Sequence, residues 1–250
     1  QQDRCARESR VILSELPEAF RHAVESMGTL LSFGDGFASC IWGCHGKEHV
    51  IENLVGRAVS NARAAFRLIE FGHYDEALSL IRNIAEIANI MWLFYNQPAH
   101  IRSWLDLPEA ERNREYSAVK VRLKLESIGA TIPCDRDEYR DLCRAAVHPD
   151  PQVRPQAHNQ NAIPTTGGYF QERAYVDCVS KLASSLASAI GPAAKVALLS
   201  KEIAEHIVST CVSLLHATPT FSTQLEEISG CSKRLLDLTL AVDKNVRMKE

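Results

Sequence analysis

The sequence predicts an all-α protein, an irregular bundle of about seven to nine helices. Three observations support this fold class. Apolar residues recur at intervals of three and four over long segments, and prolines and glycines separate these segments from one another. No run of alternating β-branched residues between turn signals is long enough to predict a strand.

Length and composition describe an ordinary globular chain. With 250 residues, 46% hydrophobic and 24% charged, it can form one large core or two modest ones. We expect a single helical domain over residues 1–250. The alternative is a division near residue 165, with a helical core at 1–165 and a C-terminal helical layer at 166–250.

Charge and cysteine content restrict the expected partners and cellular location of the protein. The formal net charge is −3, so no general positive field attracts nucleic acid, and contact with RNA or DNA requires a local patch. The eight scattered cysteines in so long a chain favour a reducing, cytoplasmic location over a disulfide framework. No apolar run reaches the length of about 20 residues that a membrane span needs, so we expect no membrane partner. The chain begins at Gln1 rather than Met, which indicates trimming or a fragment.

The N-terminal half contains three long helical segments. The first spans about 4–32, with a break expected near Pro17, and leads into the glycine-punctuated stretch "SFGDGFASCIWGCHGKE", which we predict to be a loop. The second covers 47–71 and ends at Gly72. The third, 74–96, is apolar around most of its circumference, which predicts a central, buried helix.

Shorter segments follow in the C-terminal half. A turn of helix beyond Pro98 precedes a helix predicted from Pro108 to Gly129, and another is predicted over 135–147. A long irregular connection rich in proline then leads to three further predicted helices, at 171–190, 192–217 and 219–243.

A polar stripe runs along the predicted central helix. Its members fall at steps of three and four: Asp75, Ser79, Arg82, Asn83, Glu86 and Asn89. The stripe is either a solvated edge, with Arg82 and Glu86 in a routine i,i+4 pair, or a polar seam in which those two residues orient groups in an internal site. Arg57 lies on a second polar face, on the segment 47–71, and is a candidate for the facing wall of that site.

The stretch "YRDLCRAAVHPDP" places Arg140, Arg144 and His148 on one helical face. One interpretation is an ordinary helix end, because a histidine is favoured at a C-terminus and Pro149 stops the helix. The other is phosphate chemistry, with His148 as general acid or base and an arginine holding a phosphate, which together permit metal-independent RNA cleavage through the 2′-hydroxyl. Arg154 and His158, in the following loop, are candidates to close over the substrate.

The segment "ARAAFRLIEFGHYDEALSLIRNIAEIANIMWLFY" and the later "YRDLCRAAVHPDP" together resemble a group of bacterial all-helical proteins related to the HEPN superfamily, over about residues 50–160. That superfamily includes RNases of toxin–antitoxin, abortive-infection and CRISPR-associated phage-defence systems, and members that lack catalysis. The resemblance implies a HEPN-like bundle, a homodimer, and a motif formed by Arg140, Asp141, Arg144 and His148. The spacing differs from the family motif, an arginine followed by a histidine four to six residues later: seven residues separate Arg140 from His148, and three separate Arg144 from it.

One loop offers possible metal ligands, namely Cys40, Cys44, His45 and His49. Four such groups can in principle hold zinc, but structural zinc sites usually have tighter paired spacings. We therefore expect no metal, and the two cysteines to be small buried hydrophobic residues. Glycine-rich phosphate loops, serine elbows and dinucleotide fingerprints are absent from the sequence, so no cofactor is predicted.

Two functional hypotheses follow. The first is a defence or toxin-type RNase that uses His148 with Arg144 or Arg140, and binds RNA with help from Arg82, Glu86, Arg57, Arg154 and His158. The second is a non-catalytic helical module that binds a partner protein or a small ligand. The irregular motif spacing and the negative net charge favour the second.

Overall fold

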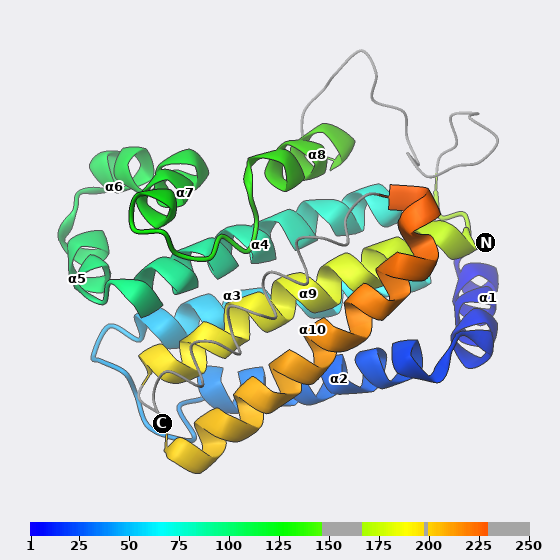
Figure 1. The fold of residues 1–250 in the computed structure, drawn as a ribbon, viewed down its shortest axis with the longest axis horizontal. Helices are drawn as coiled ribbons and strands as arrows, with labels where there is room; N and C mark the ends of the chain where they lie inside the picture. The colour runs from blue at the N-terminus through cyan, green and yellow to red at the C-terminus, as the bar shows by residue number, and fades with distance from the viewer. Residues whose placement is uncertain (147–166, 198–199, 230–250) are drawn as a thin grey trace.

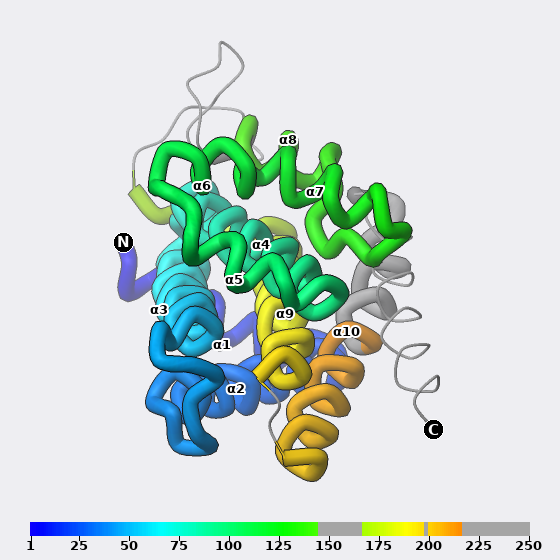
Figure 2. Tube along the Cα trace, turned by 90° about the vertical axis from the view of Figure 1, so that its left-hand side faces the viewer, coloured from blue at the N-terminus to red at the C-terminus, as the bar shows by residue number. Residues whose placement is uncertain are grey.

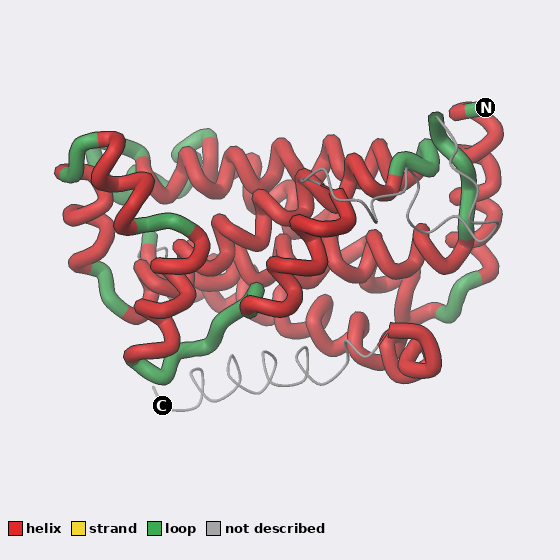
Figure 3. The backbone as a smooth tube through the Cα atoms, turned by 90° about the horizontal axis from the view of Figure 1, so that it is seen from above, coloured by secondary structure: helices red, strands yellow, loops and turns green. Residues whose placement is uncertain are grey.

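The computed structural model describes residues 1–146, 167–197 and 200–229, and within these ranges it is all-α, as predicted, with ten helices and no strand (Figures 1 and 3). The helices are α1 (Gln2–Glu15), α2 (Glu18–Ala38), α3 (Val50–Glu70), α4 (Tyr74–Asn96), α5 (Ala99–Asp106), α6 (Glu109–Glu115), α7 (Ala118–Ser127), α8 (Arg136–Ala146), α9 (Glu172–Val196) and α10 (Lys201–Ser229). The predicted break at Pro17 and the stop at Gly72 are confirmed.

The core is formed by five long helices, with α4 and α9 at its centre. Helix α9 packs against α2, α3, α4 and α10, and its buried face consists mainly of alanines and small aliphatic residues. Small side chains let neighbouring helices approach closely, which explains how one helix can contact four others. Residues from both sides of position 165 therefore contribute to one continuous apolar cluster.

A second layer, α5 to α8, covers the outer side of α4, away from α2 (Figure 2). A small apolar cluster joins α4 to α6 and α7 through Trp92, Leu93, Tyr116, Val121 and Leu125. The helix predicted from Pro108 to Gly129 is interrupted at Tyr116 and Ser117. Helix α6 ends at Tyr116, whose side chain is buried in this cluster.

The first part of the predicted loop, residues 32–38, is helical because α2 continues to Ala38, whereas residues 39–48 form a non-helical connection, as predicted. A Cβ atom on Gly34 would lie 2.1 Å from Cγ2 of Val59 in α3, and one on Gly36 would lie 2.9 Å from the Trp42 ring. These glycines thus serve close helix packing instead of a turn. The prediction failed for residues 32–38 because Gly34 and Gly36 were interpreted only as helix breakers.

Pro192 does not separate two helices, contrary to the prediction, but lies inside α9. Pro192 lacks the N–H that would bond the carbonyl of Ser188, and an internal proline costs a helix about 3 kcal/mol. Burial of α9 on several sides offsets that cost, and the preceding Gly191 lies against Cys211 of α10. Helix α10 likewise continues past the position of Pro219.

The chain returns to the start of α4 just before α9 begins. The Tyr74 hydroxyl donates a hydrogen bond to the Gln171 carbonyl (3.3 Å) and accepts one from the Gln171 N–H (3.1 Å). Next to it, the Tyr169 N–H donates to the Gly72 carbonyl at 3.3 Å. The fully buried Tyr74 therefore fixes both ends of the excursion that contains α4 to α8.

Helix α4 is more apolar than expected. Among the described residues it is the one helix long and apolar enough to cross a membrane by length and composition, which corrects the statement that no segment meets this criterion. In the bundle, 67% of its most apolar window is buried against other helices. Central helices of soluble proteins have the same composition, so this property alone does not indicate a membrane span.

Candidate functional site

The polar stripe on α4 is a seam between helices rather than a solvated edge. Arg82 pairs with Glu86 (Nη2 to Oε1, 3.4 Å), and the side chains are 21% and 27% exposed. The hydroxyl of Tyr139 in α8 donates a hydrogen bond to the same Oε1 of Glu86 at 2.9 Å. Helix α8 thus covers part of the pair.

Arg82 contacts α8 at two further points. Its Nη1 donates to Sγ of Cys143 at 3.6 Å, and its guanidinium lies 5.7 Å from the centroid of the Tyr139 ring. Arg122 of α7 approaches the same ring at 5.1 Å and is only 6% exposed. Two guanidinium groups therefore stabilise one aromatic ring through cation–π contacts.

Burial and the adjacent Glu86 carboxylate raise the pKa of the Tyr139 hydroxyl above its usual value. Tyr139 consequently keeps its proton at neutral pH and acts as a donor to Glu86. A raised pKa disfavours a proton-accepting role for this tyrosine.

Asn89, the last member of the stripe, holds the chain that leads into α8. Its Nδ2 donates to the Cys134 carbonyl at 2.8 Å, and its Oδ1 accepts from the Cys134 N–H at 3.0 Å. Asn89 is 3% exposed, so these two bonds give both the donor and the acceptor of a buried amide a partner. On the other side of α4, Asn83 accepts a hydrogen bond from Asn61 of α3 at 2.6 Å.

The predicted catalytic residues on α8 lie on its outer face. Arg140, Asp141 and Arg144 are all exposed, while Leu142 and Cys143 are buried against the bundle, as the helical spacing predicted. Arg140 is within ion-pair distance of Asp137 (3.3 Å) and Asp141 (3.8 Å). The structure therefore places Arg140 and Arg144 on the opposite side of α8 from Arg82 and Glu86.

The structure describes only one of the four other predicted residues, Arg57. His148, Arg154 and His158 lie outside the described residues. Arg57 is exposed on α3, and no hydrogen bond or ion pair within the described part of the chain joins it to Arg82 or Glu86. Asn61, on the same predicted polar face of α3, is hydrogen-bonded to α4, and the role predicted for Arg57 stays a prediction.

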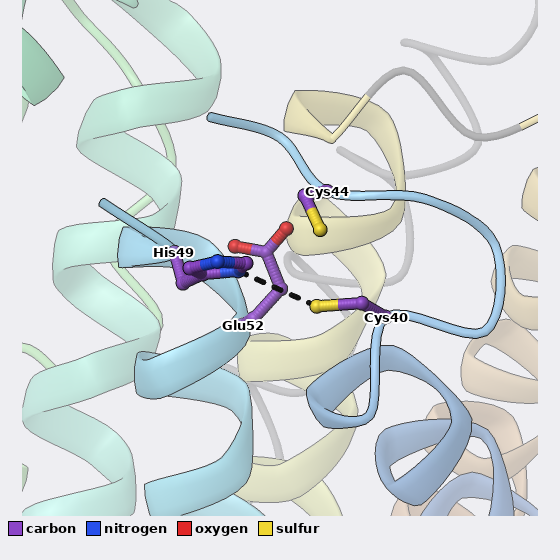
Figure 4. A group of neighbouring side chains, drawn as sticks. All are labelled: Cys40, Cys44, His49 and Glu52. Atoms are coloured by element: carbon purple, nitrogen blue, oxygen red, sulfur yellow. Dashed lines mark hydrogen bonds between the residues drawn. The ribbon is translucent and has the colours of Figure 1, made fainter. Parts of the chain in front are cut away.

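A separate group of polar residues gathers between α2 and α3 (Figure 4). Its members, named here the α2–α3 cluster, are Cys40, Cys44, His49 and Glu52, whose potential ligand atoms all lie within 4.8 Å of one another. Cys44 is exposed and Cys40 half-buried, so the expectation of two buried apolar cysteines is wrong. His45, the neighbour predicted as a possible ligand, contributes its backbone N–H instead, which donates to Glu52 at 2.5 Å.

Glu52 is the member of this cluster that the sequence-based prediction missed. It lies in the first turn of α3 and is 3% exposed. Its spacing from Val55 and Val59 places it on the apolar face of the helix, where a carboxylate is unusual. A carboxylate on an apolar helix face, three residues after His49, is the sequence signal that could have identified Glu52.

A cleft of about 560 Å³ opens at one end of the bundle. It is lined by the loop residue His45, by apolar side chains of α4 and α5 that include Phe94 and Ile101, and by Lys195 and Lys201. No hydrogen bond or ion pair among the described residues links this cleft to the seam under α8.

Comparisons with known proteins identify no relative. No family model matches the chain, and no curated protein or solved structure is significantly similar to it. The resemblance to the HEPN superfamily stays a prediction.

Proposed function

We propose that this chain is a non-catalytic helical module that binds a partner protein through the outer face of α8. The observation that carries the proposal is the position of Arg82 and Glu86. Both contact Tyr139 on the inner side of α8, so the charged pair helps to fix this helix to the bundle.

The outer face of α8 consists of Arg136, Asp137, Arg140, Asp141 and Arg144, all of them exposed. Two carboxylates lie beside Arg140, so the face combines both signs of charge. Phosphate backbones select unopposed positive charge, whereas protein surfaces provide charges of both signs. A protein with a complementary pattern of charges therefore fits this face better than RNA does.

The attachment of α8 also suits a binding role. Tyr139, Leu142 and Cys143 anchor its inner side to the bundle, and Asn89 fixes the chain that leads into it. A helix held in this way presents its outer face with little ordering cost on association. The seven free cysteines among the described residues agree with the reducing, cytoplasmic setting that we propose for this interaction.

The test of this module is a charge reversal on α8. In cells, site-specific cross-linking from α8 should capture a defined partner with the unaltered chain, and Arg140→Glu with Arg144→Glu should abolish that capture. Arg57→Glu, an exposed arginine on α3, is the matched control and should leave it intact. Equal capture by the α8 variant would refute the proposal. The masses of the free and cross-linked species show whether the captured protein is a second copy of this chain, as the predicted homodimer requires.

Metal-independent RNA cleavage is the second candidate. It is supported by the exposure of Arg140 and Arg144, one turn apart, at the end of α8 that leads toward His148. Purified protein incubated with total RNA should show cleavage that His148→Ala removes, if this candidate is correct. RNA left intact by the unaltered protein would exclude it and favour the binding module.

A further inference from the structure

The α2–α3 cluster has the dimensions of a tetrahedral metal site. Sγ of Cys40 lies 3.4 Å from Nδ1 of His49, and no pair of the four potential ligand atoms is separated by more than 4.8 Å. Ligands at about 2.0–2.3 Å from a tetrahedral zinc ion lie roughly 3.3–3.8 Å from one another. The measured Cys40–His49 separation falls in that range, and the largest separation needs a side-chain shift of only about 1 Å.

The Glu52 carboxylate points into this cluster, and one of its oxygens has no hydrogen-bond partner. Its Oε1 accepts the His45 N–H at 2.5 Å, whereas its Oε2 is buried and has no hydrogen-bond partner. No ion pair to Glu52 occurs among the described residues. A buried carboxylate oxygen without a partner is costly, and a cation bound between the side chains would satisfy it.

The backbone supports the same arrangement. Cys40 (φ 54°) and His49 (φ 50°) are the two non-glycine residues with positive φ in the described part of the chain, and both belong to the cluster. Side chains disfavour this conformation, so the surrounding structure must maintain it. Here the two residues flank the connection between α2 and α3 and direct their side chains toward each other (Figure 4).

The types of ligand atom in the cluster indicate which metal ion it would bind. Two thiolates and one imidazole favour zinc over magnesium or calcium, which take oxygen ligands. Two thiolates, a carboxylate and a neutral imidazole leave a net charge of about −1 around a divalent ion, which suits a partly buried site. Four protein ligands leave no open position, as in structural zinc sites.

We propose that the α2–α3 cluster binds one Zn²⁺ ion in a closed site that fixes the connection between α2 and α3. On binding, the two thiols release their protons to solvent, and the sulfur atoms, Nδ1 of His49 and Oε2 of Glu52 coordinate the ion. The ion links the end of α2, through Cys40, to the first turn of α3, through Glu52. This inference is independent of the binding role proposed for α8.

The experiment uses the full chain, purified under reducing conditions, stripped of metal and titrated with Zn²⁺ against a chromophoric chelator. We expect one ion per chain. Cys40→Ser and Glu52→Gln should each weaken binding by at least about tenfold, since even outer-shell changes have effects of that size. His45→Gln is the matched control, because it alters a loop histidine outside the cluster and keeps the backbone N–H that binds Glu52; its affinity should equal that of the unaltered chain.

Cobalt provides a second readout. Co²⁺ in the site should produce thiolate-to-metal charge-transfer absorption that falls in Cys40→Ser and is retained in His45→Gln. Circular dichroism identifies any variant that fails to fold. If Cys40→Ser does not fold, the zinc affinity of Glu52→Gln, which preserves side-chain shape, is compared with that of the unaltered chain. Stoichiometry near zero in the folded, reduced chain would overturn the proposal, as would equal affinity in Glu52→Gln. A Cys40–Cys44 disulfide that persists under reducing conditions without metal uptake would also overturn it.

Discussion

The inner bundle is held mainly by apolar packing, whereas α8 is joined to it by a polar seam as well as by buried apolar side chains. In the bundle, α9 contacts α2, α3, α4 and α10 through small and aliphatic side chains packed at close range. In the outer layer, α8 is joined to α4 through Arg82, Glu86, Asn89 and the Tyr139 ring. Apolar packing is sensitive to volume, whereas the seam is sensitive to single polar atoms. Substitutions that change side-chain volume should therefore have the larger effect on stability in the bundle, and substitutions that remove a polar atom should have the larger effect at the seam.

The largest expected effect tests close packing in the inner bundle. Gly34→Ala places a Cβ atom 2.1 Å from Cγ2 of the buried Val59, so we expect the free energy of unfolding to fall by about 1–3 kcal/mol. Chemical denaturation followed by circular dichroism measures this change.

Gly28→Ala is the matched control on the same helix, because a Cβ atom there meets nothing within 4 Å. It should raise the free energy of unfolding by about 0.5–1 kcal/mol through helix propensity. Equal effects of the two substitutions would show that α2 and α3 are not packed as closely as described.

A smaller effect is expected at the seam. Tyr139→Phe removes the hydroxyl that donates to Glu86, at a cost of about 1 kcal/mol. Because α8 contacts the bundle mainly through α4, the loss should appear as about fivefold faster hydrogen exchange of α8 amides through local opening. Exchange in α9 should stay unchanged. Tyr169→Phe, at an exposed tyrosine, is the control; a uniform loss of protection across the whole molecule in Tyr139→Phe would contradict the distinction between the two regions.

The smallest effect concerns pH and the outer layer. Burial and the nearby Lys124 lower the pKa of His100 below its usual 6.5. The neutral ring donates from Nε2 to Gln97 (2.9 Å) and accepts at Nδ1 from the Tyr116 hydroxyl (2.9 Å). Because the folded pKa lies below the unfolded one, this contribution to stability is present above about pH 6.5 and is lost as the pH falls toward the folded pKa.

Denaturation at a series of pH values between about 7 and 5 measures this contribution. His100→Gln should reduce the loss of stability on acidification, and Lys124→Met should reduce it in part by removing the repelling charge. If the free energy of unfolding of His100→Gln changed with pH as steeply as that of the unaltered chain, His100 would not be the source of the pH dependence.

The sequence allowed the helical class, the buried character of α4 and the inner face of α8 to be predicted, because each depends on periodicity within one segment. It did not allow the partner of the Arg82–Glu86 pair to be predicted, since Tyr139 lies 53 residues from Glu86 and no local pattern connects them. Gly34 and Pro192 were misinterpreted because burial against neighbouring helices overrides local propensity. Glu52 was missed because its role depends on a loop that folds back over the first turn of α3.

The contacts of Tyr74 with Gln171, and of Gly72 with Tyr169, have a consequence for how this fold can vary. The outer layer begins after the end of α4, which is buried in the inner bundle, and the chain returns to that bundle at Tyr169 and Gln171, which these contacts hold in place. The entropic cost of closing a loop between two fixed points grows only with the logarithm of its length, about 0.6 kcal/mol per doubling. Chains with the same five-helix bundle can therefore gain, lose or exchange outer-layer helices at little cost in stability, so different binding surfaces can be grafted onto one scaffold.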